Sequence, residues 1–191
     1  MIPRLVVASK NPDKITEIED VLEPLGVTEE IVRGLEWPDV EETGHTLEEN
    51  ALLKARAVST AVGLPAVADD TGLEVAALGG RPGVNTARFA GNNASYSENV
   101  VLLLEEMEGI VDRRARFRTV VALVFPDGAE FVAEGMVDGV ITLERRGEQG
   151  FGYDPVFEVE DRTLAELSLL EKNRLSHRAR ALRALAEVLG K

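Results

Sequence analysis

The segment "PAVADDTGLEV", Pro65–Val75, places two adjacent carboxylates after a run of small apolar residues. The sequence predicts a buried strand that stops at Asp69 and Asp70, followed by a turn at Thr71 and Gly72. Side chains alternate along a strand, so the two acids are expected to point to opposite faces. Ligands of open α/β sheets collect beyond the carboxyl ends of strands, which makes these acids candidate site residues. The alternative is that one Asp only stabilises the turn.

Helices and strands are interleaved on both sides of this segment. The predicted elements are, in chain order, a strand at 5–8, a helix beginning at Asn11-Pro12, a helix from Thr46 to about Val62, the strand of the quoted segment, a helix behind Ser97, two strands flanking Pro126-Asp127-Gly128, and a C-terminal helix. Asn and Thr are good helix N-caps, and Pro-Asp-Gly is a hairpin signal. This pattern predicts an α/β fold with a mixed sheet.

Composition limits the possible classes of protein. The 191 residues, 45% of them hydrophobic, are enough for one substantial core or two closely joined lobes. No apolar run approaches the ~18 residues of a membrane span, and the run at 5–8 is too short for a signal peptide. There are no cysteines, so a reducing cytoplasmic location is expected. The net charge of −13 argues against nucleic-acid binding and favours a hard cation such as Mg²⁺.

The loop "SKNPDK", Ser9–Lys14, leads from a strand into a helix. Unpaired N–H groups at a helix N-terminus attract anions, and Lys14 in the first turn could add a full positive charge. The segment is therefore a candidate phosphate-binding loop. The alternative is an Asn-capped helix with a solvated lysine.

Acidic residues gather in "VEETGHTLEENALLKA", residues 40–55. Glu41 and Glu42 precede a glycine turn and are either metal-binding acids or part of a solvated loop. Asn50 and Lys54 are four residues apart on one helix face, where they could form a surface pair or face a ligand.

Two later segments have different properties. "KNRLSHRARALR", Lys172–Arg183, is basic without any acid, and "GFGYDP", Gly150–Pro155, offers two aromatic rings and an acid. Aromatic faces stack on nucleobases, but the rings could equally fill the core. The basic helix could likewise pair with acidic neighbours. Together, the motifs supply the components of a nucleoside triphosphate site.

Five blocks of the chain resemble the inosine triphosphate pyrophosphatase family in order and approximate spacing. They are "SKNPDK", "EETGHTLEENALLKA", "ADDTGLEVAALGGRPGVNTARFAG", "GFGYDPVF" and "AELSLLEKNRLSHRARAL". The resemblance extends from Leu5 to about Leu185. It implies a Mg²⁺-dependent homodimer that hydrolyses noncanonical purine nucleoside triphosphates (ITP, dITP, XTP) to monophosphate and pyrophosphate. It also implies a single two-lobed α/β domain over 1–191, with a long mixed sheet flanked by helices and the active site in the cleft between the lobes.

The resemblance also implies roles for individual residues. Asp70 matches the proton acceptor and a metal ligand, and one of Glu41 and Glu42 matches the second metal-linked acid, with Glu41 favoured. The implied substrate contacts are Ser9, Lys10, Asn11, Pro12, Asp13, Lys14, Lys54, Thr71, Phe151, Gly152, Tyr153, Asp154, Lys172, His177 and Arg178. Asp69 is expected to be a supporting acid that pairs with a nearby cation or holds the turn. The chain departs from the family at 160–162, a short acidic turn where a glycine-containing loop is expected.

Base selectivity can be argued from donor chemistry. Arg178 carries only donors, so it suits the 6-oxo group of hypoxanthine or xanthine and leaves adenine unmatched. Two other functions are possible from the sequence. One is a pyrophosphatase acting on pyrimidine or methylated nucleotides, and the other is a nucleotide-sensing or RNA-end-binding module that uses the basic tail.

Overall fold

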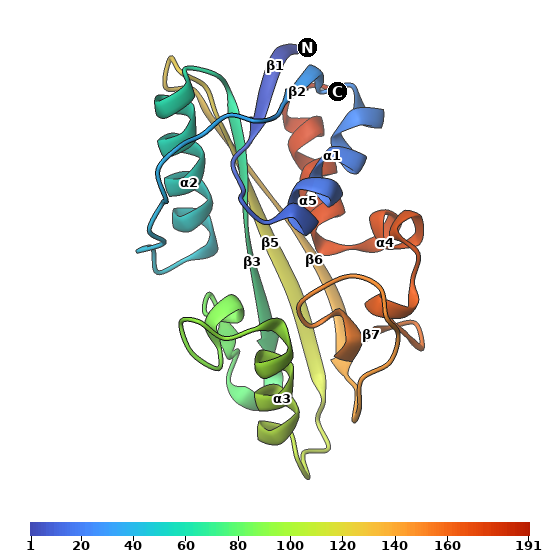
Figure 1. Ribbon diagram of the computed structural model, residues 1–191. Coiled ribbons are helices and arrows are strands. Elements are labelled where there is room, and N and C mark those ends of the chain that lie inside the picture. The colour runs from blue at the N-terminus through green and yellow to red at the C-terminus, as the bar shows by residue number, and fades with distance from the viewer. The chain divides into compact units, whose positions relative to one another are not determined.

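The computed structural model describes residues 1–191 and confirms a mixed α/β fold with an eight-stranded sheet (Figure 1). The strands are β1 (Ile2–Val7), β2 (Thr28–Val32), β3 (Ala66–Val75), β4 (Pro82–Gly83), β5 (Arg114–Val124), β6 (Glu130–Ile141), β7 (Phe157–Val159) and β8 (Arg162–Thr163). The helices are α1 (Pro12–Leu25), α2 (Leu47–Val62), α3 (Tyr96–Glu106), α4 (Leu169–Leu175) and α5 (His177–Val188). The strand order is β2-β1-β3-β5-β6-β7-β8, with β4 paired to β3. No helix has the length and apolar character that a membrane span requires.

The sheet is mixed, as predicted, because its strand pairs run in both senses. β1 pairs in parallel with β2 and β3, whereas β4 on β3 and the β6–β7–β8 series are antiparallel. The chain divides into two compact units, each with its own hydrophobic core. The first unit contains 1–70, 119–135 and 177–191, and the second contains 71–118 and 136–176. A single domain with the site in a cleft between two lobes stays a prediction.

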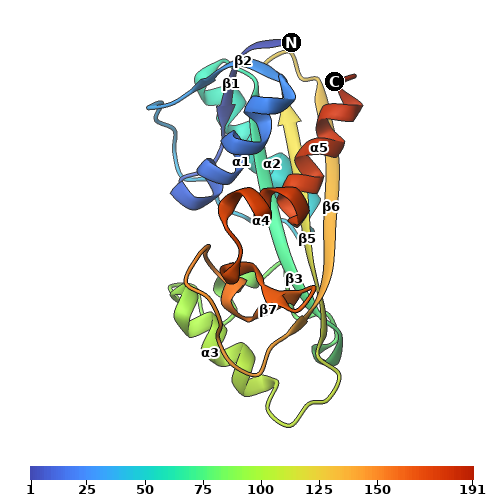
Figure 2. The same ribbon diagram turned by 90° about the vertical axis from the view of Figure 1, so that its right-hand side faces the viewer.

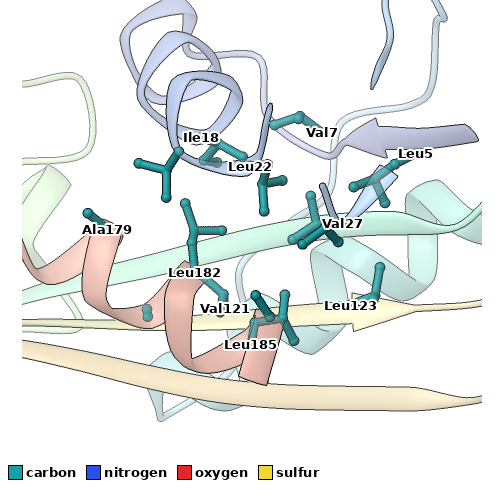
Figure 3. Close-up of a cluster of buried hydrophobic side chains, with 14 of the residues drawn as sticks. Leu5, Val7, Ile18, Leu22, Val27, Val121, Leu123, Ala179, Leu182 and Leu185 are labelled. Atoms are coloured by element: carbon teal, nitrogen blue, oxygen red, sulfur yellow. The ribbon is translucent and has the colours of Figure 1, made fainter. Parts of the chain in front are cut away.

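In the first unit, helices cover both faces of the strands. α1 and α5 lie on one face and α2 lies on the opposite face (Figures 1 and 2). The core under α1 and α5 is aliphatic: Ile18, Leu22, Leu182 and Leu185 come from the helices, and Leu5, Val7, Val121 and Leu123 from the strands (Figure 3). Burying a side chain of this size contributes roughly 1.5–3 kcal/mol, so this layer holds both helices on the sheet.

Two predicted helix starts are confirmed at the level of individual hydrogen bonds. The Asn11 side chain caps α1, and Thr46 forms a reciprocal capping box with Glu49 at the start of α2. Both helices end at glycines in the left-handed conformation, Gly26 and Gly63. These local signals fix where each helix begins and ends without help from the core.

Two helix predictions differ from the structure. The third helix is capped by Ser95 and not Ser97, because Ser95 has Glu98 three residues later and the two form a capping box. Helix α4 was not predicted, although Ser168 and Glu171 form the same arrangement at its start.

The predicted end of β3 at the two acids is wrong. The strand continues through Thr71 and Gly72 to Val75. Its last residues stay extended because β4 pairs with them, with Leu73 opposite Gly83, and because Leu73 and Val75 are fully buried in the second core. Both acids therefore lie within the strand and not at its carboxyl end.

The second unit is centred on aromatic packing around β7. The rings of Phe117 and Phe157 are tilted, with centroids 4.6 Å apart. Gly139 of β6 leaves room for the Phe157 ring, because a Cβ there would lie 2.8 Å from Phe157 Cζ and would also clash with the Glu158 carbonyl oxygen. The same core includes Tyr153, from the predicted base-side loop.

Candidate active site

The two acids of β3 contact different helices on opposite faces of the sheet. Asp69 faces α1 and α5 and forms ion pairs with Lys14 and Arg178. Asp70 faces α2 and contacts Asn50 and Lys54. The expected alternation is confirmed, and it gives the neighbouring carboxylates separate environments.

Asp69 is held in a buried network of alternating charge. Its Oδ2 atom lies 3.1 Å from Lys14 Nζ and accepts hydrogen bonds from Arg178 Nη2 (3.0 Å) and Nε (3.2 Å). Arg178 Nη1 donates to Glu17, which is also buried. Although burial alone would raise the pKa of Asp69, Lys14 and Arg178 outweigh it and hold the pKa well below its usual value. Pairing of Asp69 with a cation is confirmed.

Burial acts on the basic partners of Asp69 as well. It lowers the pKa of Lys14, and the attraction of Asp69 only partly offsets this effect. For Arg178, burial is outweighed by Asp69 and Glu17, which raise its pKa. Arg178 therefore stays charged while three of its nitrogens donate to carboxylates.

Asp70 belongs to a second cluster, built around one lysine. Lys54 Nζ lies 3.3 Å from Asp70 Oδ1 and 2.6 Å from Glu42 Oε1. The Asn50 amide donates to Asp70 Oδ2 at 3.2 Å. Burial raises the pKa of Asp70, while Lys54 pulls it down less strongly. For Lys54, burial is outweighed by the carboxylates, Asp70 first among them, and its pKa is raised.

This cluster distinguishes between the two candidate glutamates. Glu42 shares the Lys54 ammonium with Asp70, whereas Glu41 is exposed. The structure therefore places Glu42, and not Glu41, in the same ion-pair cluster as Asp70, although the resemblance led us to favour Glu41 as the metal-linked acid. Asn50 supports the geometry, because its Oδ1 accepts the Gly44 N–H at 2.8 Å while its amide holds Asp70.

Asn50 is absent from the predicted site residues, and Glu17 was missed as well. Asn50 could have been added, since it lies four residues before Lys54 and so shares its helix face. The sequence gives little indication that Glu17 belongs to the site. It follows Lys14 by three residues, but its partner Arg178 is distant in sequence.

The Glu42–Asp70 pair fits a hard divalent cation. Both side chains offer carboxylate oxygens, and they already share one cation, the Lys54 ammonium. Mg²⁺ is commonly held by one or two carboxylates together with substrate phosphates. No group of three or more His, Cys, Asp or Glu side chains converges in the structure.

The loop before α1 is organised by its own side chains. Ser9 Oγ accepts the Asn11 N–H at 3.2 Å, and Asn11 Oδ1 accepts the N–H groups of Asp13 (3.0 Å) and Lys14 (3.5 Å). Pro12 is the first helical residue. The Asn cap of the alternative interpretation is thus observed, but the Lys14 ammonium is turned toward Asp69 instead of extending into solvent.

Lys10 has a different environment from Lys14. Its ammonium pairs with Asp39 at the surface, and its side chain is 57% exposed, compared with 20% for Lys14. Lys14 is therefore the lysine of this loop that lies beside the β3 acids.

In the second unit, the predicted base-side loop is held by a buried ion pair. Lys172 Nζ lies 2.5 Å from Asp154 Oδ2 and 4.9 Å from the centroid of the Phe151 ring. Asp154 Oδ2 also accepts the Phe151 N–H at 2.9 Å. Tyr153 is buried, and its hydroxyl donates to the Thr86 carbonyl at 3.0 Å. Phe151 is the partly accessible ring, whereas Tyr153 fills the core.

The remaining predicted residues are placed as follows. Thr71 is half-buried in β3, directly after Asp70. Gly152 lies in the base-side loop with φ +63°, a conformation that favours glycine. His177 is buried at the start of α5, where its Nδ1 lies 2.6 Å from Thr119 Oγ1.

Relatives match this chain over almost its full length. A dITP/XTP pyrophosphatase from Bacillus subtilis is 46% identical over 189 residues, which cover 96% of each chain. A dITP/XTP pyrophosphatase from Thermus thermophilus is 50% identical over 188 residues, covering 96% of this chain and 90% of that protein.

Solved structures agree with this relationship. A HAM1 protein from Coxiella burnetii superimposes with a TM-score of 0.87 at 43% identity, covering 99% of each chain. The Ham1 protein of Staphylococcus aureus gives a TM-score of 0.85 at 40% identity and covers 98% of each chain. A sequence model described as the Ham1 family matches residues 5–188. The chain belongs to the Ham1 family.

Proposed function

We propose that this protein is a Mg²⁺-dependent pyrophosphatase that converts ITP, dITP and XTP to the nucleoside monophosphate and pyrophosphate. Relatives that are 46–50% identical over nearly the whole chain are named dITP/XTP pyrophosphatases. The observation that carries the proposal is the cluster in which Glu42 and Asp70 share a single cation position, occupied by the Lys54 ammonium. Two carboxylates around a cation are what metal-assisted attack on a phosphoanhydride requires.

In the proposed reaction, Asp70 accepts a proton from the attacking water. Its carboxylate is oriented by Asn50, and its raised pKa brings it closer to the range of an effective general base. Glu42 and Asp70 would hold Mg²⁺. When bound, this ion would supply charge that polarises the phosphate oxygens and acidifies a water molecule. Lys14 and Lys54 would stabilise the negative charge that develops on the phosphates.

Recognition of the base is proposed to depend on donors that meet an acceptor oxygen at position 6. Lys172 and Arg178 are donor-only side chains from the predicted set. Adenine has an amino group at this position, so it would offer these donors no acceptor in a water-poor site. Phe151 adds an aromatic face for stacking.

The proposal is tested by measuring pyrophosphate release from ITP, dITP, XTP, GTP, ATP and dTTP, with Mg²⁺ and with EDTA. We expect ITP, dITP and XTP to be the best substrates and EDTA to abolish release. Preference for dTTP would favour a pyrimidine-directed enzyme. Binding without pyrophosphate release would favour a nucleotide sensor. Light scattering on the same sample tests the proposed homodimer.

A further inference from the structure

Lys54 occupies the position that the proposed function gives to a metal ion. Its ammonium lies between Glu42 Oε1 and Asp70 Oδ1, at 2.6 and 3.3 Å. The exposed fractions of the three side chains are 14%, 30% and 9%, respectively, so the cluster is largely removed from water. Two carboxylates this close repel each other unless a cation separates them, and here the cation comes from the chain itself.

The local architecture holds Asp70 in place, whereas Lys54 reaches the cluster on a flexible side chain. Asp70 lies within β3 and is held by Asn50, which also fixes the Gly44 N–H in the loop that carries Glu42. A lysine ammonium, in contrast, is a point charge on a flexible four-carbon stem with three rotatable donors. It can exchange a carboxylate for another anion without moving the helix.

We propose that Lys54 is a resident counter-ion that competes with the divalent cation for Glu42 and Asp70. The inference rests on the proposed function, because it takes these two acids as the metal ligands. The ammonium partly balances the charge of the two carboxylates while no substrate is bound. Entry of the metal displaces Lys54 from at least one of them, and a substrate phosphate gives the ammonium its new partner.

This competition has two consequences. Divalent cations should bind weakly to the nucleotide-free protein, since each must first separate the ammonium from its carboxylates. Binding of metal and triphosphate should be coupled, and the coupling acts equally in both directions. Removing Lys54 should therefore impair catalysis and yet tighten binding of the metal alone.

The experiment measures Mn²⁺ binding by isothermal titration calorimetry at pH 7.5 without nucleotide, so that no turnover is needed. Lys54→Met and Lys54→Gln should bind Mn²⁺ about tenfold more tightly than the wild type, because a competing positive charge is gone. Lys54→Arg keeps the charge and should bind as weakly as the wild type. Asp70→Asn should lose binding.

Arg56→Met is the matched control. Arg56 lies on the same helix and pairs with Glu130 at 2.6 Å, so this variant removes a cation from a carboxylate outside the cluster. It should leave Mn²⁺ affinity unchanged. Thermal unfolding monitors the fold: Lys54→Met should melt below the wild type without Mn²⁺ and recover in its presence. Lys54→Gln retains a donor and serves if Lys54→Met does not fold.

The outcomes separate the inference from the proposed function. If Asp70→Asn loses Mn²⁺ but neither neutral Lys54 variant gains affinity, the counter-ion role is wrong and the metal site stands. A Lys54→Arg variant that binds as tightly as Lys54→Met would overturn it as well. If Asp70→Asn binds Mn²⁺ as the wild type does, the metal assignment fails and the inference fails with it.

Discussion

Replacing Arg178 with Met should lower the free energy of unfolding by about 3 kcal/mol. The Arg178 side chain is 3% exposed, and its partners Asp69 and Glu17 are 1% and 5% exposed. Removing one partner from a buried ion pair typically costs about 3–5 kcal/mol, because a charge stays buried without its counter-charge. We expect the lower end, since Asp69 keeps Lys14 at 3.1 Å.

Urea denaturation, followed by circular dichroism, measures this cost. Arg116→Met is the control: it removes an exposed guanidinium from Asp138, which is also exposed, and should cost less than about 1 kcal/mol. The double variant Arg178→Met, Glu17→Gln should recover part of the loss, since the unmatched carboxylate is neutralised. An Arg178→Met variant no less stable than Arg116→Met would refute the reasoning.

The same network predicts a dependence on pH. The pKa of Asp69 is lowered in the folded protein, so the carboxylate contributes stability above its unfolded pKa of about 3.9 and loses it as the pH falls further. Arg178→Met removes part of that shift. The difference in unfolding free energy between variant and wild type should therefore shrink below about pH 4.

Three further substitutions test other parts of the structure. Asp70→Asn should reduce the rate of pyrophosphate release at least about 100-fold, because the proposed proton acceptor is lost. The melting temperature should not fall, since burial raises the pKa of this carboxyl and so favours a neutral group there. Near-normal release would show that Asp70 is not the proton acceptor. Gly44→Ala should reduce turnover more than stability, because the added Cβ would lie 2.6 Å from Asn50 Oδ1 and displace the amide that orients Asp70. An unchanged kcat would show that the hydrogen bond from Asn50 to Asp70 is dispensable. Asp161→Gly should stabilise the protein by about 1 kcal/mol, because Asp161 (φ +66°) and Glu160 (φ +52°) form a two-residue β7–β8 turn in the left-handed region, which favours glycine. The melting temperature should rise by about 2–4 °C, and a fall would contradict the assignment of strain.

Local rules account for most of what the sequence predicted correctly. Asn11 and Thr46 cap their helices through side-chain bonds to residues two or three positions later, so the signal and its effect lie in one short segment. The same rule places the start of α3 at Ser95, where Glu98 completes the capping box, and it would have revealed α4 behind Ser168. In both places the capping-box pattern is present in the sequence but was not used in the prediction.

The length of β3 depends on contacts that no local pattern contains. Thr71 and Gly72 have turn-like composition, but the strand persists because β4 hydrogen-bonds to its far half. Gly83 meets Leu73 across that pair, which brings together residues from separate predicted segments. Turn propensity is a weak preference, and strand pairing with burial overrides it.

Charge balance assigns different tasks to the adjacent acids of β3, independently of any resemblance. On the face of Asp69, two acids meet two cations, Lys14 and Arg178, so the network is neutral and each carboxylate has a partner. On the face of Asp70, Glu42 and Asp70 both pair with Lys54, and the formal charges of these three groups sum to a negative value. A divalent cation would therefore gain more from the Glu42 and Asp70 carboxylates than from the Asp69 network. Alternation along the strand separates the two acids, and the helices packed on each face give them different charged partners.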